Sequence, residues 1–107
     1  MSGYSTKELA SEFLGSFIFY AIVISQKNDQ FSPLVCGIAL FIGILIAKIG
    51  SENAGHLNPG VTFFSYLNGN FTESHAVYFI VVQLIAAVTA WQWNYYINKD
   101  SIVIKNL

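Results

Sequence analysis

The chain has 107 residues, of which 54% are hydrophobic and only 10% are charged. Since an average soluble domain carries roughly 25% charged residues, this composition predicts an integral membrane protein and leaves no room for a soluble catalytic domain. The formal net charge is −1, and the five basic residues are all Lys, without a basic cluster. We therefore expect the lipid bilayer as a partner, and no nucleic acid, no cofactor and no enzymatic activity.

Two apolar stretches in the first half of the chain are long enough for membrane-spanning helices, which take about 20 residues each. The first covers about residues 9–25 and is closed by a short charged loop, residues 26–30. The second covers about residues 34–49. Pro33 suits the first turn of this second helix, because the N–H that proline lacks has no intrahelical partner there.

A third span is expected over about residues 74–97, with Glu73 near the positive end of its dipole. Aromatic residues gather at the far end of this span, as they do at the lipid headgroup level. The tail, residues 98–107, is then expected outside the hydrocarbon. The aromatic residues are Trp91, Trp93, Tyr95 and Tyr96.

Small residues recur at every fourth position on all three spans. Such rows let helix backbones approach closely in lipid, although small residues are also common in spanning helices in general. Together the rows predict a compact bundle that forms one domain, residues 1–107. They are Ser11 and Gly15, then Ala39, Gly43 and Ala47, then Ala86 and Ala90.

A polar, turn-prone insert lies between the second and third spans, over about residues 51–68. Asn58 followed by Pro59 is a strong helix start, because an Asn N-cap binds a first-turn N–H and Pro is pre-set for the first helical position. A half-helix from there to about Leu67 would be about 15 Å long, half of a ~30 Å hydrocarbon core. We predict a re-entrant loop and half-helix; an ordinary extramembrane loop is the alternative.

A re-entrant insert would be suited to passing small polar molecules. Non-helical backbone, here residues 53–57, is tolerated at membrane depth only when it is buried in protein or lines a wet cavity. Its free carbonyls would form a line of acceptors, and the Asn58 amide would add donors. The positive end of the half-helix would oppose cations and protons.

The insert resembles the first pore loop of the aquaporin and aquaglyceroporin (major intrinsic protein) family, whose signature reads Ser-Gly-Ala-His-x-Asn-Pro-Ala-Val-Thr. The residues that carry the resemblance are His56-Leu57-Asn58-Pro59-Gly60-Val61-Thr62-Phe63. Two further segments are similar to the family's first and third spans, Glu12-Phe13-Leu14-Gly15-Ser16-Phe17 and Gln83-Leu84-Ile85-Ala86-Ala87. The resemblance implies an all-α membrane fold, three transmembrane helices plus one re-entrant pore half-helix, which is half of an aquaporin-like fold.

The resemblance also implies roles for individual residues. Glu12 should accept hydrogen bonds from the pore-loop backbone, although a helix-end Glu at the water interface is the alternative. His56 should narrow the vestibule, unless its ring is hydrogen-bonded away from the lumen. Gln83 should bond the loop backbone rather than face lipid. A metal site is not expected, because His75 is the only other His and no acidic or thiol cluster accompanies the two.

The chain departs from the family pattern at several points. Asn53, Ala54 and Gly55 stand for the signature's Ser, Gly and Ala, and Gly60 stands for its second Ala. Val61 follows, where the family's second pore loop has an Arg, and this chain has no Arg at all. By offset, the narrow selectivity ring would fall on Ile38, Ile46, Gly55 and Val61. Because these are apolar or small, we expect a pore that passes glycerol-like neutral solutes or water less strictly than a water-only filter.

Family members contain two such halves in inverted orientation, and the sequence contains one. Lys7 and Lys48 would lie on one side of the membrane and Lys27, Lys99 and Lys105 on the other, a nearly balanced distribution that predicts dual topology. We expect a homo-oligomer: an antiparallel homodimer in which the Asn58-Pro59-Gly60 motifs of two copies meet at the midplane. Four such pairs, eight chains, would correspond to the family's tetramer.

Two other functions stay open at this point. A short dual-topology chain with Glu12 in its first span is also typical of small proton-coupled transporters, in which the Glu carries protons and substrate. Alternatively, the chain is a non-conducting relic or a partner subunit of another channel half.

Overall fold

The computed structural model describes residues 5–105, with side chains described up to residue 99. The described residues form four helices and no strand. Three of them are long and apolar enough to cross a membrane, the last of these over Glu73–Lys99. The predicted all-α membrane class, with half of an aquaporin-like fold, is thereby confirmed. The helices are α1 (Thr6–Ser25), α2 (Ser32–Gly50), α3 (Pro59–Leu67) and α4 (Glu73–Lys105).

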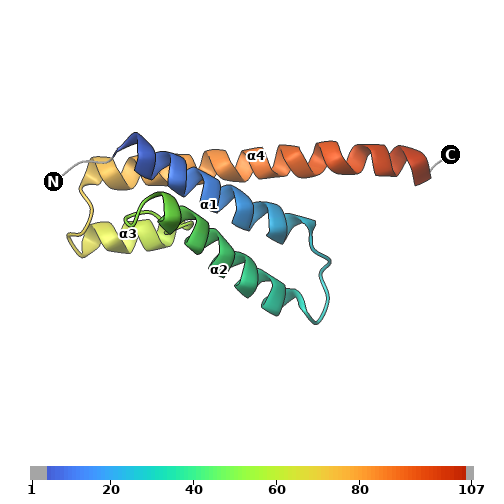
Figure 1. The fold of residues 1–107 in the computed structure, drawn as a ribbon, viewed down its shortest axis with the longest axis horizontal. Coiled ribbons are helices and arrows are strands. Elements are labelled where there is room, and N and C mark those ends of the chain that lie inside the picture. Colours follow the sequence, from blue (N-terminus) through green and yellow to red (C-terminus); the bar gives the residue numbers. More distant parts are fainter. Residues whose placement is uncertain (1–4, 106–107) are drawn as a thin grey trace.

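Helix α1 lies at the centre of the bundle, with α2 packed on one side of it and α4 on the other (Figure 1). The short helix α3 packs against α4. It begins near the middle of the molecule and ends at the end where α4 begins (Figure 1). The insert between α2 and α3 therefore turns back inside the bundle, which is the path that a re-entrant loop takes.

Local signals explain where the first two helices begin. Ser5 caps α1 by accepting a hydrogen bond from the Glu8 N–H at 3.1 Å, and the Glu8 carboxylate accepts from the Ser5 N–H at 3.2 Å. This reciprocal pair is a capping box, which satisfies donors that the first turn leaves without partners. Helix α2 has Pro33 in its first turn, where the missing N–H costs nothing.

The predicted rows of small residues form the helix contacts. All of them are buried: Ser11, Gly15, Ala39, Gly43, Ala47, Ala86 and Ala90. The backbones of α1 and α2 approach most closely where Gly15 faces Gly43, because a methyl group added to Gly15 would lie 2.5 Å from the Gly43 carbonyl oxygen. The prediction of a compact bundle built on small residues is confirmed for this pair of helices.

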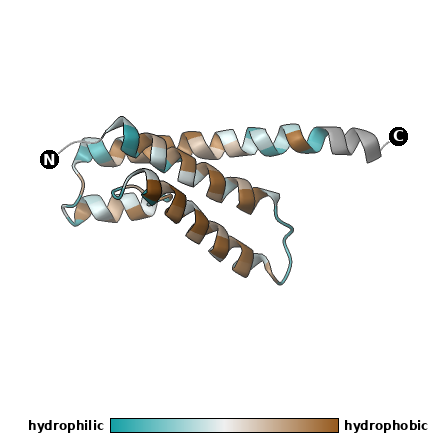
Figure 2. Cartoon of the chain, in the orientation of Figure 1, coloured by the Kyte–Doolittle hydropathy of each residue, from teal (hydrophilic) through white to brown (hydrophobic). Residues whose placement is uncertain are grey.

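Helix α4 extends beyond the expected span of about residues 74–97. It continues without a break to Lys105, and its part that is apolar enough to cross a membrane covers Glu73–Lys99. Residues 98–105 contain neither Gly nor Pro, and Asn98 donates to Asn94 one turn earlier at 3.0 Å, so nothing stops the helix. Its length of about 50 Å, at 1.5 Å per residue, exceeds the hydrocarbon thickness. Figure 2 shows the apolar part of α4 giving way to polar residues toward this end.

Candidate pore site

The insert has a folded backbone with two left-handed positions. Gly55 has a φ of 109°, and Leu57 has a φ of 58°, which is uncommon for a residue with a branched apolar side chain. Ala54 and Leu57 are fully buried and form the core cluster with Ala47, against which Phe19 and Ile44 pack. The insert is thus anchored by its apolar side chains, and its backbone groups are left to polar partners.

Glu12 is the main polar partner of the insert. Its side chain is fully buried in α1, and its carboxylate accepts backbone N–H groups of three consecutive residues: Gly55 at 2.7 Å, His56 at 3.1 Å and Leu57 at 2.5 Å. Three donors directed at one carboxylate satisfy its negative charge without a counter-ion. A surface position for Glu12, the alternative considered from sequence, is wrong.

Gln83 reaches the insert through side chains and not through the loop backbone, which corrects the expectation from the resemblance. Its Nε2 donates to the Glu12 carboxylate at 2.9 Å and to the Thr62 hydroxyl at 2.9 Å. All three side chains are fully buried. Gln83 therefore joins α4 to both α1 and α3. Its Oε1 is buried and has no hydrogen-bond partner within the described part of the chain.

His56 is held by its ring. Its Nδ1 lies 2.9 Å from the Thr62 hydroxyl, and the ring stacks on Phe71 at 4.7 Å and contacts Phe79 at 5.3 Å. These contacts fix the ring between α3, the loop before α4 and α4 itself. Whether His56 narrows the vestibule stays a prediction, because the ring remains half-buried.

A second histidine completes this aromatic cluster. The ring of Phe71 also stacks on His75, at 3.7 Å, and His75 Nε2 lies 3.0 Å from the buried carboxylate of Glu8 at the start of α1. These ring and side-chain contacts therefore join the insert to the loop before α4, and the start of α4 to the start of α1. Within residues 5–99, no three His, Cys, Asp or Glu side chains gather in a way that could hold a metal ion.

Asn58 caps α3, as the sequence predicted. Its Oδ1 accepts the Gly60 N–H at 2.6 Å, and Pro59 occupies the first helical position. Its NH₂ group makes no hydrogen bond within the described residues, and the side chain is exposed. Helix α3 has nine residues, a length of about 14 Å, so it covers about half of a ~30 Å hydrocarbon core.

The carbonyl groups of the three residues before Leu57 differ from those at the start of the insert, where Ser51 accepts from the Ala54 N–H and Glu52 accepts from Lys48. No described residue donates a hydrogen bond to the carbonyls of Ala54, Gly55 or His56. The Leu57 carbonyl, in contrast, accepts the hydroxyl of Tyr20 at 2.7 Å. Among the described residues, the site therefore has three consecutive carbonyls without a donor, and Asn58, two residues further along the chain, has a free NH₂ group.

The expected selectivity ring is not assembled within one copy. Ile38 and Ile46 are eight residues apart on α2, about 12 Å along the helix axis, so they cannot lie at one level. Ile46 lines a crevice against Ser11 and Leu14 of α1. A methyl group added to Gly55 would instead meet Lys48 and Ile44, at 3.3 and 3.5 Å. Ile44 and Ile46 point to different sides of α2, because two residues turn a helix by about 200°.

Val61 and Ile38, the remaining members of that ring, are both accessible. Val61 is half-buried in the first turn of α3, and Ile38 is 49% exposed on α2. Both are therefore available to a lumen or to a second molecule, and the fold of one copy does not decide between the two.

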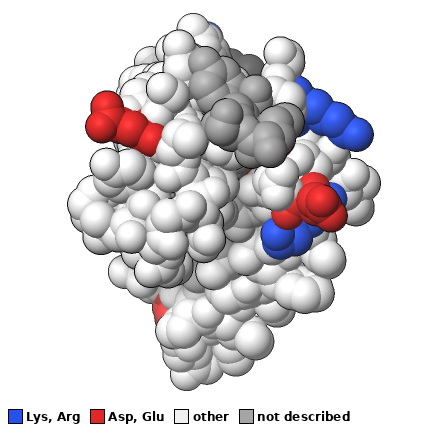
Figure 3. Space-filling model, turned by 90° about the vertical axis from the view of Figure 1, so that its left-hand side faces the viewer, with Lys and Arg blue, Asp and Glu red and all other residues white. Residues whose placement is uncertain are grey.

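Charged side chains are sparse at the end of the molecule where α1 begins. Figure 3 views this end and shows a few acidic and basic side chains, with no patch of a single sign. Lys48 is exposed and donates to the Glu52 carbonyl at 3.0 Å, so it binds the start of the insert. This weak charge pattern is compatible with the near balance of Lys residues noted from sequence.

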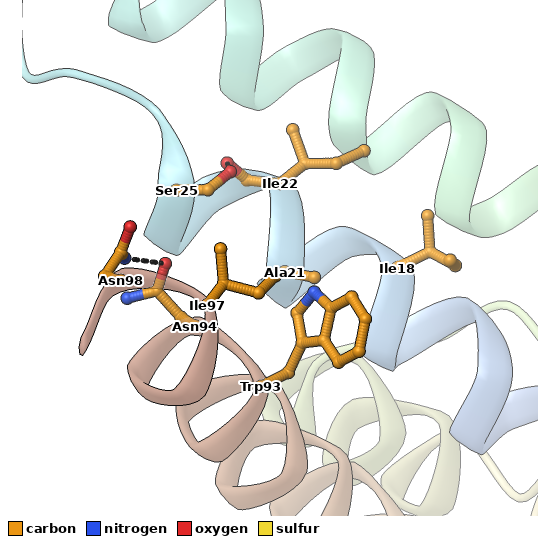
Figure 4. Close-up of a pocket in the computed structure, with 8 residues that line it drawn as sticks. All are labelled: Ile18, Ala21, Ile22, Ser25, Trp93, Asn94, Ile97 and Asn98. Carbon is orange, nitrogen blue, oxygen red and sulfur yellow. Dashed lines mark hydrogen bonds between the residues drawn. The ribbon is translucent and has the colours of Figure 1, made fainter. Parts of the chain in front are cut away.

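A crevice between α1 and α4 lies at the opposite end from the insert (Figure 4). It has a volume of about 400 Å³ and no charged lining residue. Its polar side chains bind within their own helices, Asn98 to Asn94 and the Ser25 hydroxyl to the Ile22 carbonyl (Figure 4). The crevice is therefore an apolar gap where the two helices diverge, and not part of the polar site. It is lined by Ile18, Ala21, Ile22, Ser25, Trp93, Asn94, Ile97 and Asn98.

Three residues of the site were not singled out from the sequence. Thr62 connects Gln83 to His56, Tyr20 binds the insert, and the Leu57 side chain fills the space where α1 and α2 meet. A hydroxyl in the middle of an apolar span was the available signal for Tyr20. Leu57 carried no signal, because a Leu in a membrane protein predicts nothing by itself.

Comparisons with known proteins agree with this geometry. The family model described as Major intrinsic protein matches residues 2–105. Aquaporin-5 of Sus scrofa is 28% identical over 88 residues, which are 77% of this chain and 33% of the relative. Aquaporin PIP1-1 of Arabidopsis thaliana is 33% identical over 89 residues, 73% of this chain and 31% of the relative. Glycerol uptake facilitator protein-like 6 of Lactiplantibacillus plantarum is 30% identical over 90 residues, 78% of this chain and 40% of the relative.

The chain spans about a third of the length of the two aquaporins, covering 33% of the first and 31% of the second. No solved structure matches the chain. The family model nevertheless covers nearly all of the sequence, and three helices are long and apolar enough to cross a membrane. The chain is an integral membrane protein and belongs to the major intrinsic protein family.

Proposed function

We propose that the protein forms a passive channel for water and small neutral, glycerol-like solutes. The observation that carries this proposal is the row of free carbonyls from Ala54 to His56. Glu12 binds the N–H groups of the same peptide units, and Asn58, two residues after His56, has a free NH₂ group. Solutes with hydroxyl groups need both acceptors and donors along their path. The names of the relatives, an aquaporin and a glycerol uptake facilitator protein, support this choice of solutes.

The proposed pore is completed by a second, inverted copy of the chain. Helix α3 covers only about half of the hydrocarbon depth, so the other half of the lumen needs a wall. Asn58 is exposed at the inner end of α3, and a polar side chain at that depth is costly unless protein or water covers it. Two copies related by an axis in the membrane plane bring the two Asn58 side chains together.

The composition of the site supports a pore less strict than a water-only filter. No Arg is present in the chain, and the accessible residues Ile38 and Val61 are apolar. An apolar wall opposite the polar insert suits the carbon side of a polyol, whose hydroxyls then face the carbonyls. We therefore expect glycerol to pass together with water.

Proton-coupled transport by Glu12 is less compatible with the contacts of that residue. The carboxylate is fully buried and accepts hydrogen bonds from three backbone N–H groups and from Gln83. Protonation would place a hydrogen where donors already point, which is costly. These contacts support a fixed structural role for Glu12.

The test is reconstitution of the purified chain into liposomes. Stopped-flow swelling should give glycerol uptake and water flux well above those of empty liposomes, and a pH gradient should change neither. Water flux without glycerol uptake would contradict the proposed solute range. Flux driven by a pH gradient would support a carrier, and no flux would support a relic or a subunit of another channel half.

Replacing Asn58 by Asp tests the role of the motif. The change removes the NH₂ donors and adds a negative charge at the midplane, so neutral-solute flux should fall about tenfold or cations should leak. Asn28→Asp, in the exposed loop between α1 and α2, is the matched control and should leave both unchanged. If the two variants have the same neutral-solute flux and the same cation leak, Asn58 does not line the pore.

A further inference from the structure

We propose that Tyr20 is a positioning residue of the pore, which sets the direction of the Asn58 side chain by holding the carbonyl of Leu57. This inference rests on the proposed channel function and adds to it a residue outside the family motifs. Tyr20 lies on α1, eight residues after Glu12. Its hydroxyl donates to the Leu57 carbonyl at 2.7 Å, across 37 positions of sequence.

Leu57 is the residue at which the insert turns into α3. Its φ of 58° lies in the left-handed region, which a Leu adopts only where its surroundings hold it. Its N–H is bound to Glu12, and its fully buried side chain lies between Gly15 and Gly43, since methyl groups added there would meet it at 3.1 and 2.8 Å. The Leu57 carbonyl is the remaining backbone group, and it accepts a hydrogen bond from the Tyr20 hydroxyl.

The carbonyl of Leu57 and the nitrogen of Asn58 share one planar peptide unit. A hydrogen bond to that carbonyl therefore fixes the orientation of this peptide plane, and with it the position of the Asn58 Cα. The Asn58 side chain is tied to its own backbone region through Oδ1, which accepts from Gly60 N–H at 2.6 Å. The direction of its free NH₂ group thus follows from the backbone, and Tyr20 controls it without touching it.

The half-buried Tyr20 ring is itself held, because it packs beside Phe19 with 5.4 Å between ring centroids. Phe19 packs in turn on the core cluster that contains Leu57. Removing only the hydroxyl, as in Tyr20→Phe, should leave this packing in place. The variant therefore isolates the hydrogen bond from the ring.

The functional readout is the ratio of glycerol to water permeability in liposomes. A glycerol molecule must engage several acceptors and the Asn58 donors at once, whereas a water molecule needs one partner at a time. In Tyr20→Phe the ratio should fall about two- to tenfold, the range that one hydrogen bond of this kind is worth. Tyr95→Phe, at an exposed tyrosine near the far end of α4, is the matched control and should keep the wild-type ratio.

A structural readout separates this inference from the channel proposal. In solid-state NMR of the chain in bilayers, Tyr20→Phe should shift the Leu57 carbonyl ¹³C and the Asn58 side-chain ¹⁵N resonances, and Tyr95→Phe should shift neither. If Tyr20→Phe fails to fold, 3-fluorotyrosine incorporated at position 20 keeps the ring and makes the hydroxyl a stronger donor, so it should move the same two resonances.

The outcomes are distinct. Wild-type flux with an unchanged ratio in Tyr20→Phe would overturn the inference and leave the proposed function standing. Absence of wild-type flux would overturn the proposed function. In that case unmoved Asn58 resonances would overturn the inference as well, and shifted ones would support the positioning role.

Discussion

Glu12 organises the site at the scale of a single residue. A backbone that leaves the helix inside a membrane must find partners for its N–H groups, because no water is present to bind them. The one carboxylate binds three consecutive N–H groups of the insert and the Gln83 amide. As a result the carbonyls on the other side of the same peptide units stay free for a solute. The negative charge of Glu12 thus holds the backbone of the insert in its folded conformation.

Replacing Glu12 by Gln tests this role. The amide keeps one acceptor oxygen but turns an NH₂ group toward backbone donors, so the free energy of unfolding should fall by about 2–3 kcal/mol. Equilibrium unfolding in mixed detergent micelles, followed by circular dichroism, measures the change. Glu52→Gln, at an exposed side chain, should stay within about 0.5 kcal/mol of wild type. Similar values for both variants would show that the insert does not depend on Glu12.

At the scale of elements, the contact between α1 and α2 decides where the insert can lie. Gly15 and Gly43 let the two backbones touch, and Leu57 fits against both. A larger residue at either glycine would push the helices apart and displace Leu57 together with the start of α3. The small residues thus act on the site, although none of them lines it.

Gly43→Ala tests the helix contact. The added methyl group would lie 2.8 Å from the Gly15 carbonyl oxygen and 2.8 Å from the Leu57 Cδ1, so the free energy of unfolding should fall by about 1–3 kcal/mol. Gly37→Ala on the same helix is the matched control, because nothing lies within 4 Å of its added methyl group. The control should be neutral or more stable by up to about 1 kcal/mol. A loss of similar size in both variants, measured by the same unfolding assay, would show that the close contact at Gly43 is not its cause, because Ala has a higher helix propensity than Gly.

At the scale of the whole molecule, the unpaired half-helix calls for a second copy. Helices α1, α2 and α4 surround the insert on one side only, and exposed apolar side chains such as Phe41, Phe63 and Phe64 remain on the other faces. Lipid can cover these side chains, but it cannot cover Asn58. The antiparallel dimer is therefore argued from the polar end of α3 and not from the apolar surface.

Cysteine cross-linking tests the orientation of the two copies. In a Cys36→Ser background, Asn58→Cys should form a disulfide-linked dimer in membranes under mild oxidation, because the two motifs meet at the midplane in the proposed antiparallel dimer. Asn68→Cys, at the other end of α3, should not, since in an antiparallel pair the two ends lie about 25 Å or more apart, beyond the roughly 7 Å that a disulfide spans. Cross-linking at residue 68 and not at residue 58 would indicate a parallel dimer.

Topology mapping gives an independent check of the same model. With lysines nearly balanced across the membrane, a tag at the C-terminus should be accessible from both sides of intact cells. A tag found on one side only would contradict dual topology. The flux experiments would then decide whether another partner completes the pore.

Features that depend on neighbours in sequence could be predicted from the sequence itself. The spans follow from runs of apolar residues, the cap of α3 from Asn58 and Pro59, and the helix contact from small residues at every fourth position. Each of these relations lies within one continuous segment of the chain. The continuation of α4 past its span could not be predicted from hydropathy, because the polar residues after Ile97 end the apolar run although none of them breaks a helix.

Contacts between distant residues were decided only by the tertiary structure. The partners of Gln83, the ring contacts of His56, the bond from Tyr20 to Leu57 and the separation of Ile46 from Gly55 depend on how the helices are rotated against one another. A side chain in a span faces lipid, a neighbouring helix or a lumen according to that rotation, and periodicity alone does not set it. The sequence thus determined that a half-helix with a polar N-cap follows the insert, and the packing of α1 against α2 and α4 decided which atoms of the insert remain free.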